Sequence, residues 1–323
     1  MKVGLIGLGR HGTRYAQHLT EKESPAKLVA ICRRDSERGQ AFARKQQIRF
    51  HQHPTALAQD PDVEAIIVVT PPSLTYPIAK VAIEHRKPLL IEKPLAASGQ
   101  DARFIVHQAS KANIPIMTAH TLRYETTVQK LKESLLSVGN TQYISLTARL
   151  EHRPHSPEEI KAWNGRGALL EIGIHLLDAI RFLTGEEIRE VHCESPDTRP
   201  THPEEQIWGR LTTQSGIPCL LDISRVSHAR TTHIDLIGAA GQIRADWSKG
   251  LLSVQRHRHQ SEKHSFPKTS TIRFVLQDFI RALKTGTTMP ITGEDGLRAV
   301  EIAEACYESV TQKQPVSLSH KKV

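Results

Sequence analysis

The chain has few cysteines and no long apolar run, and both scarcities exclude whole classes of protein. Its 323 residues include four scattered cysteines (Cys32, Cys193, Cys219 and Cys306), none of them in a Cys-x-x-Cys pair. This spacing offers no metal site and suits a reducing cytoplasm. No apolar stretch approaches the roughly 18–20 residues of a membrane helix, and the amino terminus does not read as a signal peptide. We therefore expect a cytoplasmic protein without a membrane segment.

Blocks of like charge are also absent, although the chain has a formal net charge of +9. Residues 1–120 hold 17 Lys and Arg against 10 Asp and Glu, whereas the remainder holds 26 against 24. The surplus lies in the first 120 residues, with no run of five basic residues and no nucleic-acid-binding signature. We expect it to serve a phosphate-bearing small molecule. The alternatives are a solvated basic face and, without any supporting signature, nucleic acid.

Residues 1–120 alternate strand-sized apolar runs with helical stretches. The runs occupy residues 3–6, 28–32, 65–69, 89–91 and 114–119, and the helical stretches occupy residues 13–19, 36–47, 74–85 and 99–113. Continuous apolar strands between helices form parallel sheets that are covered on both faces. The pattern predicts an α/β domain with a doubly wound parallel sheet over residues 1–120.

Residues 121–323 have a different pattern, in which apolar and polar residues partly alternate in short runs separated by turn-rich stretches. Strands are expected at residues 143–150, 207–212, 219–224, 233–237 and 251–255, and helices at residues 169–183, 272–283 and 293–311. This predicts a C-terminal α+β domain with a large, open, mostly antiparallel sheet and helices on one face. The last helix, about 293–311, could pack back on the first domain.

A glycine-rich turn, Gly7-Leu8-Gly9-Arg10-His11-Gly12, follows the first expected strand and opens a helix. In this context it is the dinucleotide-binding fingerprint, whose glycines allow a tight turn and close approach of the backbone to a pyrophosphate. The helix N-terminus offers N–H groups to the phosphates. We expect these six residues to bind a dinucleotide.

Arginines stand at the end of the second expected strand, where a carboxylate usually binds a ribose 2′-hydroxyl. The chain reads Cys32-Arg33-Arg34-Asp35-Ser36 at this point. Arg33 and Arg34 suit a 2′-phosphate through charged hydrogen bonds, and Ser36 could add a hydroxyl donor. This favours NADP over NAD. Asp35 as the ligand of an unphosphorylated ribose is the alternative.

Two more turns follow expected strands at the same edge of the sheet. Glu92-Lys93-Pro94 follows the strand at 89–91, and Thr70-Pro71-Pro72 ends the preceding strand. Ligands of open α/β sheets bind outside the carboxyl ends of the strands. We therefore expect Lys93 in that crevice, in a turn that Pro94 makes rigid, and Thr70-Pro71-Pro72 on the nicotinamide side.

The helix expected over 169–183 carries a polar stripe on an otherwise apolar surface. Glu171, His175 and Asp178 are spaced i, i+4, i+7 and share one face. Burying such groups is unfavourable unless they are paired or functional. Gly173 in mid-helix costs about 1 kcal/mol relative to alanine, which indicates close approach of a ligand. From the residues alone, a structural and a functional His175 remain equally open.

Together these motifs resemble the Gfo/Idh/MocA family, named after glucose–fructose oxidoreductase, inositol dehydrogenase and rhizopine catabolism proteins. The likeness covers nearly the whole chain, including Arg123-Tyr124 and Gln314-Pro315-Val316. It implies a Rossmann domain, hydride exchange between nicotinamide and a sugar, polyol or related carbon, and an open sheet that forms an oligomer interface.

The resemblance also implies roles for single residues. By position, Lys93 is the motif lysine, His175 the usual acid/base and Glu171 the acidic residue one turn before it, where most relatives have Asp. These three residues, with Arg123 and Tyr124, are expected to bind substrate. Trp163, just before the His175 helix, could cap the substrate pocket or simply pack.

The sequence therefore predicts an NAD(P)-dependent oxidoreductase acting on CH–OH or C=O groups, with Lys93 and His175 as the catalytic pair. We expect a homodimer or homotetramer through the C-terminal sheet, because one helix cannot cover both faces. Two alternatives stay open: a non-catalytic NADP-binding regulator on the same fold, and an NAD-dependent glycosidase.

Overall fold

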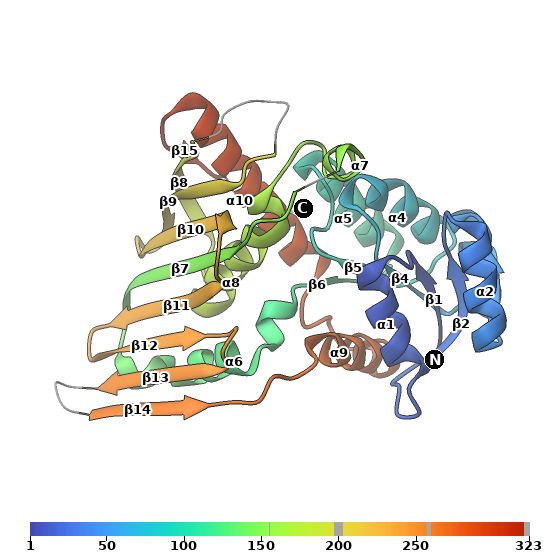
Figure 1. Ribbon diagram of the computed structural model, residues 1–323, viewed down its shortest axis with the longest axis horizontal. Coiled ribbons are helices and arrows are strands. Elements are labelled where there is room, and N and C mark those ends of the chain that lie inside the picture. The colour runs from blue at the N-terminus through green and yellow to red at the C-terminus, as the bar shows by residue number, and fades with distance from the viewer. Residues whose placement is uncertain (155, 197–202, 257–259, 320–323) are drawn as a thin grey trace. The chain divides into compact units, whose positions relative to one another are not determined.

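A computed structural model describes residues 1–154, 156–196, 203–256 and 260–319, which divide into two compact units (Figure 1). The first unit comprises Met1–His120 and Ser270–Leu297. The second comprises Thr121–Thr269 and the described residues from Arg298 onward. The fold is the predicted one, a doubly wound parallel sheet followed by a mixed, mostly antiparallel sheet.

The first unit is built on a six-stranded, wholly parallel sheet in the order β3-β2-β1-β4-β5-β6. The inner strands β1, β4 and β5 are mostly apolar and are buried along almost their whole length, as a sheet covered on both faces requires. The strands are β1 (Lys2–Ile6), β2 (Lys27–Cys32), β3 (Arg49–His51), β4 (Ala65–Val68), β5 (Leu89–Glu92) and β6 (Ile116–Ala119).

Helices alternate with these strands, and two of them begin at side chains that cap their first turn. Asp35 accepts from the backbone N–H of Arg38 at the start of α2, and Ser98 accepts from that of Asp101 at the start of α5. The helices are α1 (Arg10–Thr20), α2 (Ser36–Gln46), α3 (Pro54–Gln59), α4 (Thr75–Glu84) and α5 (Gly99–Ala112), with a short 3₁₀ turn η1 (Pro72–Leu74) before α4.

The first unit also contains residues 270–297, which the predicted division at residue 120 had assigned to the second domain. This segment holds α9 (Thr271–Thr285), which packs against α1. The Ser270 hydroxyl lies 2.7 Å from His18 Nε2, and Thr292 bridges Met117 on β6. The apolar face of α9 is covered within the first unit, so chain order alone misassigned it.

The second unit is built on a nine-stranded sheet in the order β14-β13-β12-β11-β7-β10-β9-β8-β15, which can be followed strand by strand in Figure 1. Only β7 and β10 pair in parallel; all the other neighbours are antiparallel. The strands are β7 (Thr141–Glu151), β8 (Ile188–Glu194), β9 (Gln206–Thr213), β10 (Pro218–Ser227), β11 (Thr231–Gly238), β12 (Gly241–Asp246), β13 (Leu251–Arg256), β14 (Gln260–Ser265) and β15 (Val316–Ser317).

Burial alternates along these strands, because one face of the sheet carries the helices. On β7, for example, Ile144, Leu146 and Ala148 are buried. The helices and helical turns are η2 (Thr121–Tyr124), α6 (Thr126–Ser134), η3 (Leu135–Val138), α7 (Pro157–Ala162), η4 (Leu169–Gly173), α8 (Ile174–Thr184) and α10 (Gly293–Gln312), whose residues from Arg298 belong to this unit.

The single helix expected over 169–183 is interrupted near its start. Leu169–Gly173 forms one π turn, η4, and the α-helix α8 runs from Ile174 to Thr184 and ends at Gly185. Single π turns inside helices occur frequently at functional sites. Glu171 lies in the π turn and His175 in the first turn of α8.

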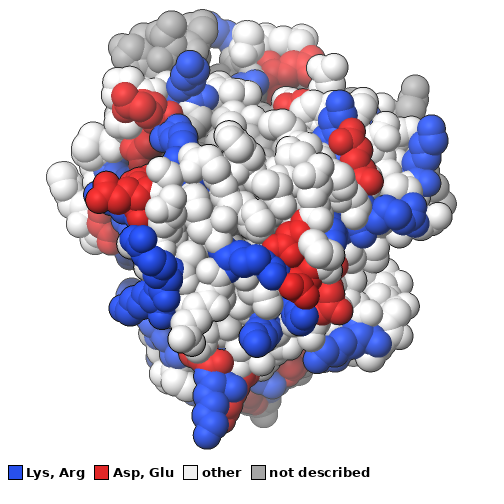
Figure 2. Space-filling model, turned by 90° about the vertical axis from the view of Figure 1, so that its right-hand side faces the viewer, with Lys and Arg blue, Asp and Glu red and all other residues white. Residues whose placement is uncertain are grey.

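Charged residues are mixed on the face of the molecule drawn in Figure 2, where Lys and Arg alternate with Asp and Glu rather than forming one basic field. Part of the basic surplus of the first unit is paired: Arg49 contacts Asp60 and Asp62 at 2.7 Å each, and Lys2 contacts Asp62 at 2.8 Å. Within the described part of the chain, no helix combines the length and apolar character needed to cross a membrane.

Candidate functional site

The glycine-rich turn after β1 has a shape that lets a ligand contact its backbone. Gly7 has φ +94°, and a Cβ there would lie 2.1 Å from the carbonyl oxygen of Val69. A Cβ on Gly12 would lie 2.0 Å from the carbonyl oxygen of Gly7, whereas one on Gly9 would meet nothing within 4 Å. The outer two glycines thus close the turn, and Gly9 faces open space that a phosphate can approach.

Helix α1 begins within this turn, at Arg10, and leaves its first N–H groups available. Its N-cap residue is Gly9, whose lack of a side chain leaves the helix end without a side-chain cap. The first turn contains no acidic residue. An uncapped N-terminus with a positive dipole end is suited to an anion such as a pyrophosphate.

At the end of β2, Arg33 and Asp35 are already engaged within the protein. Arg33 donates from Nη1 to the carbonyl oxygen of Leu8 at 2.9 Å, which ties this strand end to the glycine-rich turn. Asp35 caps α2, and Arg34 and Ser36 are exposed. Arg33 and Arg34 therefore stand at the strand end where a ribose 2′-substituent is expected, and the Asp35 carboxylate caps a helix there.

Thr70 follows β4 beside this turn and carries an unsatisfied polar atom. Its Oγ1 is buried and has no hydrogen-bond partner among the described residues, and its Cγ2 would lie 3.1 Å from a Cβ on Gly7. Pro71 is exposed, and Pro72 is buried at the start of η1. A buried hydroxyl without a partner is unfavourable, so the Thr70 hydroxyl fits a polar ligand group at this edge.

The buried carboxylate of Glu92 connects the Glu92-Lys93-Pro94 turn to α1. It accepts a hydrogen bond from the Tyr15 hydroxyl at 2.6 Å, and His11 Nε2 lies 2.9 Å from the same oxygen. The other carboxylate oxygen accepts from the backbone N–H of Lys93 at 3.0 Å. The Lys93–Pro94 peptide is cis. Glu92 therefore joins residues of both predicted cofactor motifs.

The electrostatics of this network follow from burial and charge. Burial by itself raises the pKa of Glu92, but the hydrogen bond and charge of His11, the charge of Lys93 and the Tyr15 hydroxyl outweigh burial, so the pKa lies below its usual value. Burial, together with the adjacent Glu92 charge, raises the pKa of Tyr15 well above its usual value. The Tyr15 hydroxyl is therefore a permanent donor to a carboxylate.

In the second unit, the polar stripe of the His175 helix is bound by arginines at both ends. Arg225 on β10 makes two hydrogen bonds to the Glu171 carboxylate, with Nε 3.1 Å from Oε2 and Nη2 2.5 Å from Oε1. Arg123 on η2 makes two to the fully buried Asp178, at 2.8 and 2.7 Å. His175 lies between these two pairs in sequence.

The close approach at Gly173 is to β10 and not to a ligand. A Cβ on Gly173 would lie 2.2 Å from Ile223 Cδ1 and 2.9 Å from Leu169 Cδ1. The glycine therefore lets the π turn pack directly on the sheet. This contact corrects the expectation drawn from its position in the helix.

The segment that leads into the π turn is held by Glu204. Its buried carboxylate accepts from the backbone N–H groups of Gly167 and Leu169, at 2.8 Å each, and from the Tyr307 hydroxyl at 2.9 Å. Burial raises the pKa of Glu204 despite these donors. Trp163, the half-buried C-cap of α7, precedes this segment.

The predicted site residues thus form two sets. Most of those predicted for the cofactor, with Lys93, surround the carboxyl ends of β1, β2, β4 and β5 in the first unit, whereas Arg123, Tyr124, Trp163, Glu171 and His175 belong to the second. Sequence reasoning missed Tyr15, Glu204 and Arg225. Tyr15 is four positions after His11 on one helix, a spacing that could have signalled it; the other two carry no local signal.

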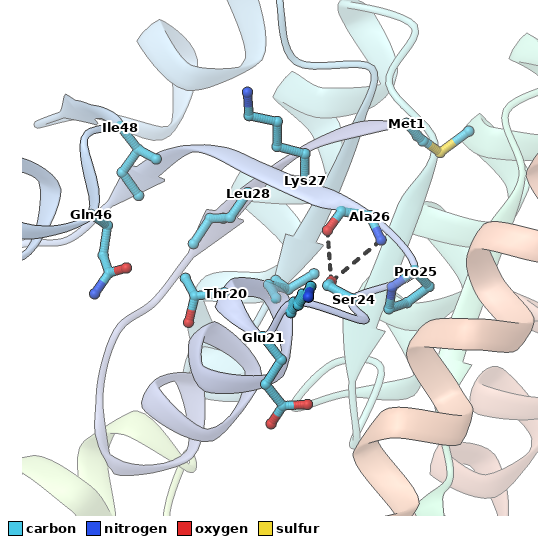
Figure 3. A pocket seen from close by; sticks show the side chains of 12 residues that line it. Met1, Thr20, Glu21, Ser24, Pro25, Ala26, Lys27, Leu28, Gln46 and Ile48 are labelled. Carbon is cyan, nitrogen blue, oxygen red and sulfur yellow. Dashed lines mark hydrogen bonds between the residues drawn. The ribbon is translucent and has the colours of Figure 1, made fainter.

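A separate open pocket of about 440 Å³ lies at the amino-terminal ends of β1 and β2 (Figure 3). It is lined by residues at the end of α1 and the start of β2, among them Thr20, Ser24 and Lys27. The Ser24 hydroxyl there donates to the carbonyl oxygen of Ala26 at 2.6 Å. None of the predicted site residues lines this cavity.

The Glu92 network predicts a stability difference that depends on pH. Glu92→Gln should lower the free energy of unfolding by about 2–3 kcal/mol at pH 7, because buried donors lose a charged acceptor. The pKa of Glu92 is lower in the folded state than in the unfolded state. The ionised carboxylate therefore stabilises the fold fully above the unfolded-state pKa of about 4.3. This stabilisation is lost as the pH falls through the folded-state pKa. Urea unfolding at pH 7 and pH 3.5 measures this.

The matched control is Glu84→Gln at the exposed end of α4, which should leave the free energy of unfolding within about 0.5 kcal/mol of the wild type. An equal deficit of Glu92→Gln at both pH values would contradict the network as described.

Comparison with known proteins confirms the family resemblance. Residues 1–120 match the model of an oxidoreductase family with an NAD-binding Rossmann fold, and residues 152–318 match the C-terminal α/β domain of the same family. The chain is 26% identical to a myo-inositol 2-dehydrogenase from Thermotoga maritima, covering 98% of each chain. It is 24% identical to a D-apiose dehydrogenase from Paraburkholderia graminis, covering 98% of this chain and 89% of the relative.

Solved structures share the whole fold. An oxidoreductase domain protein from Kribbella flavida superposes with a TM-score of 0.89 at 21% identity, covering 98% of this chain and 99% of the other. A UDP-N-acetylglucosamine 3-dehydrogenase from Acidithiobacillus ferrooxidans superposes with a TM-score of 0.84 at 21% identity, covering 97% and 98%. With both family domains matched in order, the chain belongs to the Gfo/Idh/MocA family of oxidoreductases.

Proposed function

We propose that this chain is an NADP-preferring oxidoreductase that transfers a hydride between nicotinamide and a sugar, polyol, cyclitol or related small hydroxy or carbonyl compound. The observation that carries the proposal is the Glu92 network, which fixes the Lys93 turn to the helix that follows the glycine-rich turn. The names of the relatives, inositol and apiose dehydrogenases, support the substrate class.

The first unit offers donors of the right kind for a dinucleotide. The open side of Gly9 and the uncapped N-terminus of α1 suit the pyrophosphate, and the Thr70 hydroxyl suits a carboxamide on the nicotinamide side. When bound, the nicotinamide ring supplies the hydride acceptor or donor. The protein's part is to orient it and to manage the substrate proton.

Arg33 and Arg34 support NADP over NAD. Arg33 keeps donors beyond the one that it gives to Leu8, Arg34 is exposed, and a 2′-phosphate uses such charged donors better than a hydroxyl does. Solved relatives include both a complex with NAD⁺ and a putative NADPH-dependent oxidoreductase, so the preference is a property to be measured on this chain.

Lys93 and His175 are the proposed catalytic residues. An imidazole can remove the hydroxyl proton while hydride departs, because its pKa lies near working pH. A lysine ammonium beside the same oxygen would stabilise the negative charge that develops on it. In the reducing direction the same groups would deliver a proton to the carbonyl oxygen.

The substrate can be found by a turnover screen. We would test myo-inositol, scyllo-inositol, D-apiose and other aldoses with NADP⁺ and NAD⁺, following absorbance of the reduced cofactor. Turnover of at least one polyol or sugar is expected. Tight cofactor binding without any turnover would instead support a regulator, and hydrolysis of glycosides without net redox change would support a glycosidase.

The cofactor preference yields a direct prediction. NADPH should bind about tenfold or more tightly than NADH, since a charged hydrogen bond contributes about 1.5–3 kcal/mol. Arg33→Asp should reverse this order, whereas Arg44→Asp, at an exposed position near the end of α2, should not. Fluorescence titration of both cofactors measures it, and NADH binding as tightly as NADPH to the unaltered chain would refute the preference.

The catalytic roles yield a second prediction. Lys93→Ala and His175→Ala should each lower kcat by about 10²–10⁴, with NADP⁺ affinity nearly preserved. Lys80→Ala, at an exposed position on α4, serves as the control and should leave kcat unchanged. Single-turnover hydride transfer is the measurement. Near-wild-type rates in both variants from pH 6 to 9 would overturn the assignment.

We also propose that the open face of the nine-stranded sheet packs against a second copy of the chain. Trp208, Leu220 and Ile237 project from this face and are 41–42% exposed in the single chain, so a second copy packed on this face would cover them. The dimer or tetramer that this implies extends the prediction made from the sequence.

Light scattering at micromolar concentration should therefore report a dimer or tetramer. Leu220→Arg should shift the population toward monomer, because it places a charge inside the apolar contact. Leu136→Arg, at a 96% exposed position on η3, should have no effect. A monomeric wild-type chain would disprove the assembly.

A further inference from the structure

Two carboxylate–guanidinium pairs flank His175 along its helix. Glu171, four positions before it, is paired with Arg225, and Asp178, three positions after it, is paired with Arg123. Residues at these spacings are neighbours on a helix surface. Both acids therefore lie on the side of the helix that carries His175, and each has an arginine as its partner.

The packing of the π turn on β10 brings Arg225 to Glu171. Gly173 allows the turn to contact Ile223, and Arg225 lies two positions beyond Ile223 on the same side of that strand. The Arg225 guanidinium contacts the carboxylate of Glu171, which lies in this π turn. Aspartate, one methylene shorter, would not extend as far toward the guanidinium as Glu171 does.

Burial makes this pair electrostatically effective. The side chains of Arg225 and Glu171 are only 12% and 19% exposed, whereas the Arg149–Asp222 pair on the open face of the sheet is 52% and 35% exposed. Charges that are partly removed from water act on their neighbours with less screening. A guanidinium remains charged at every accessible pH, so Arg225 offsets the Glu171 charge continuously.

The other charged groups around this helix have defined partners. Arg123 of η2 lies over the Phe182 ring at 5.3 Å as well as on Asp178. Lys132 of α6 donates to the carbonyl oxygen of Leu183 at 2.8 Å, near the far end of α8. Tyr124 is the other titratable side chain of η2, and Arg181 near the end of α8 pairs with Glu187 at 2.6 Å.

The strand beneath α8 adds no charge on the face that carries the helices. Strand β7 presents Ile144, Leu146 and Ala148 there, all of them buried. Glu204 contacts the start of the π turn, where its carboxylate accepts from the backbone N–H groups of Gly167 and Leu169 and from the Tyr307 hydroxyl. Glu171 is the acidic side chain of the turn itself, and its carboxylate is paired with Arg225.

We propose that Arg225 is a positioning residue that holds Glu171 in a two-bond ion pair and so sets the proton affinity of His175. The role rests on the proposed function, in which His175 is the acid/base. Without Arg225, an uncompensated carboxylate beside the imidazole would stabilise imidazolium and weaken the group as a base. Arg225 thus keeps His175 able to accept a proton near neutral pH.

The test is the pKa of His175 in the full chain, measured by NMR with ¹³C-labelled histidine and assigned by loss of the signal in His175→Gln. Arg225→Met should raise it by about 0.5–1 unit, because the carboxylate is no longer neutralised. Glu171→Gln should lower it by a similar amount, because the guanidinium then stands alone. The double variant, which removes both charges, should return it close to the wild-type value.

The matched control is Arg181→Met, which removes another two-bond pair, with Glu187, near the opposite end of the same helix. It should leave the His175 pKa unchanged. If Arg225→Met does not fold, the Glu171→Gln arm and the double variant still decide the question. An unchanged or lowered pKa in Arg225→Met, or an unchanged or raised pKa in Glu171→Gln, would overturn the proposal.

This measurement needs neither cofactor nor substrate. Absence of turnover in the substrate screen would therefore count against the proposed function alone, and the pKa series would still report on Arg225. When a substrate is known, the acidic limb of the kcat profile should move to higher pH in Arg225→Met and to lower pH in Glu171→Gln.

Discussion

The buried carboxylate of Glu92 is the group on which the organisation of the first unit's site depends. A carboxylate at this depth is stable only if donors surround it, and here they come from the side chains of His11 and Tyr15 and from the backbone of Lys93. Those donors belong to α1, the helix that the dinucleotide fingerprint opens, and to the turn that contains Lys93. Satisfying one buried charge therefore fixes two functional segments relative to each other.

The same constraint organises the second unit. Glu204, Asp178 and Glu171 are partly or fully buried carboxylates, and each accepts at least two hydrogen bonds, from backbone N–H groups or from an arginine. Glu204 holds the segment that leads into the π turn, Arg225 holds the π turn itself, and Arg123 holds the helix beyond it. These acids fix the segment that contains His175, and in our proposal Arg225 also offsets the charge of Glu171 beside it.

Much of the fold could be predicted because its signals are local. The inner strands of the first sheet are continuous apolar runs, and the turns that follow them contain glycines, prolines and charged residues that a cofactor site requires. Strand β3, with only Arg49–His51, is too short and polar to be recognised. The π turn was also missed, since the apolar periodicity of residues 169–183 suits an uninterrupted helix.

The contacts that complete the site could not be predicted, because they join distant parts of the chain. Tyr15 meets Glu92 across 77 positions, and Arg225 meets Glu171 across 54. Helix α9 follows the second sheet in sequence and yet belongs to the first unit. Gly173 shows the same limit at one residue: its unusual position was recognised, but its neighbour is a strand more than forty positions away and not a ligand.

The most direct test of the account is the affinity of Glu92→Gln for NADP⁺, measured by calorimetry at pH 7.5 on protein whose fold is verified by circular dichroism. Because Glu92 orders the segments around the glycine-rich turn, the account predicts at least about tenfold weaker binding, the equivalent of about 1.4 kcal/mol. Binding with the wild-type affinity would contradict it, since the carboxylate would then stabilise the fold without organising the cofactor site.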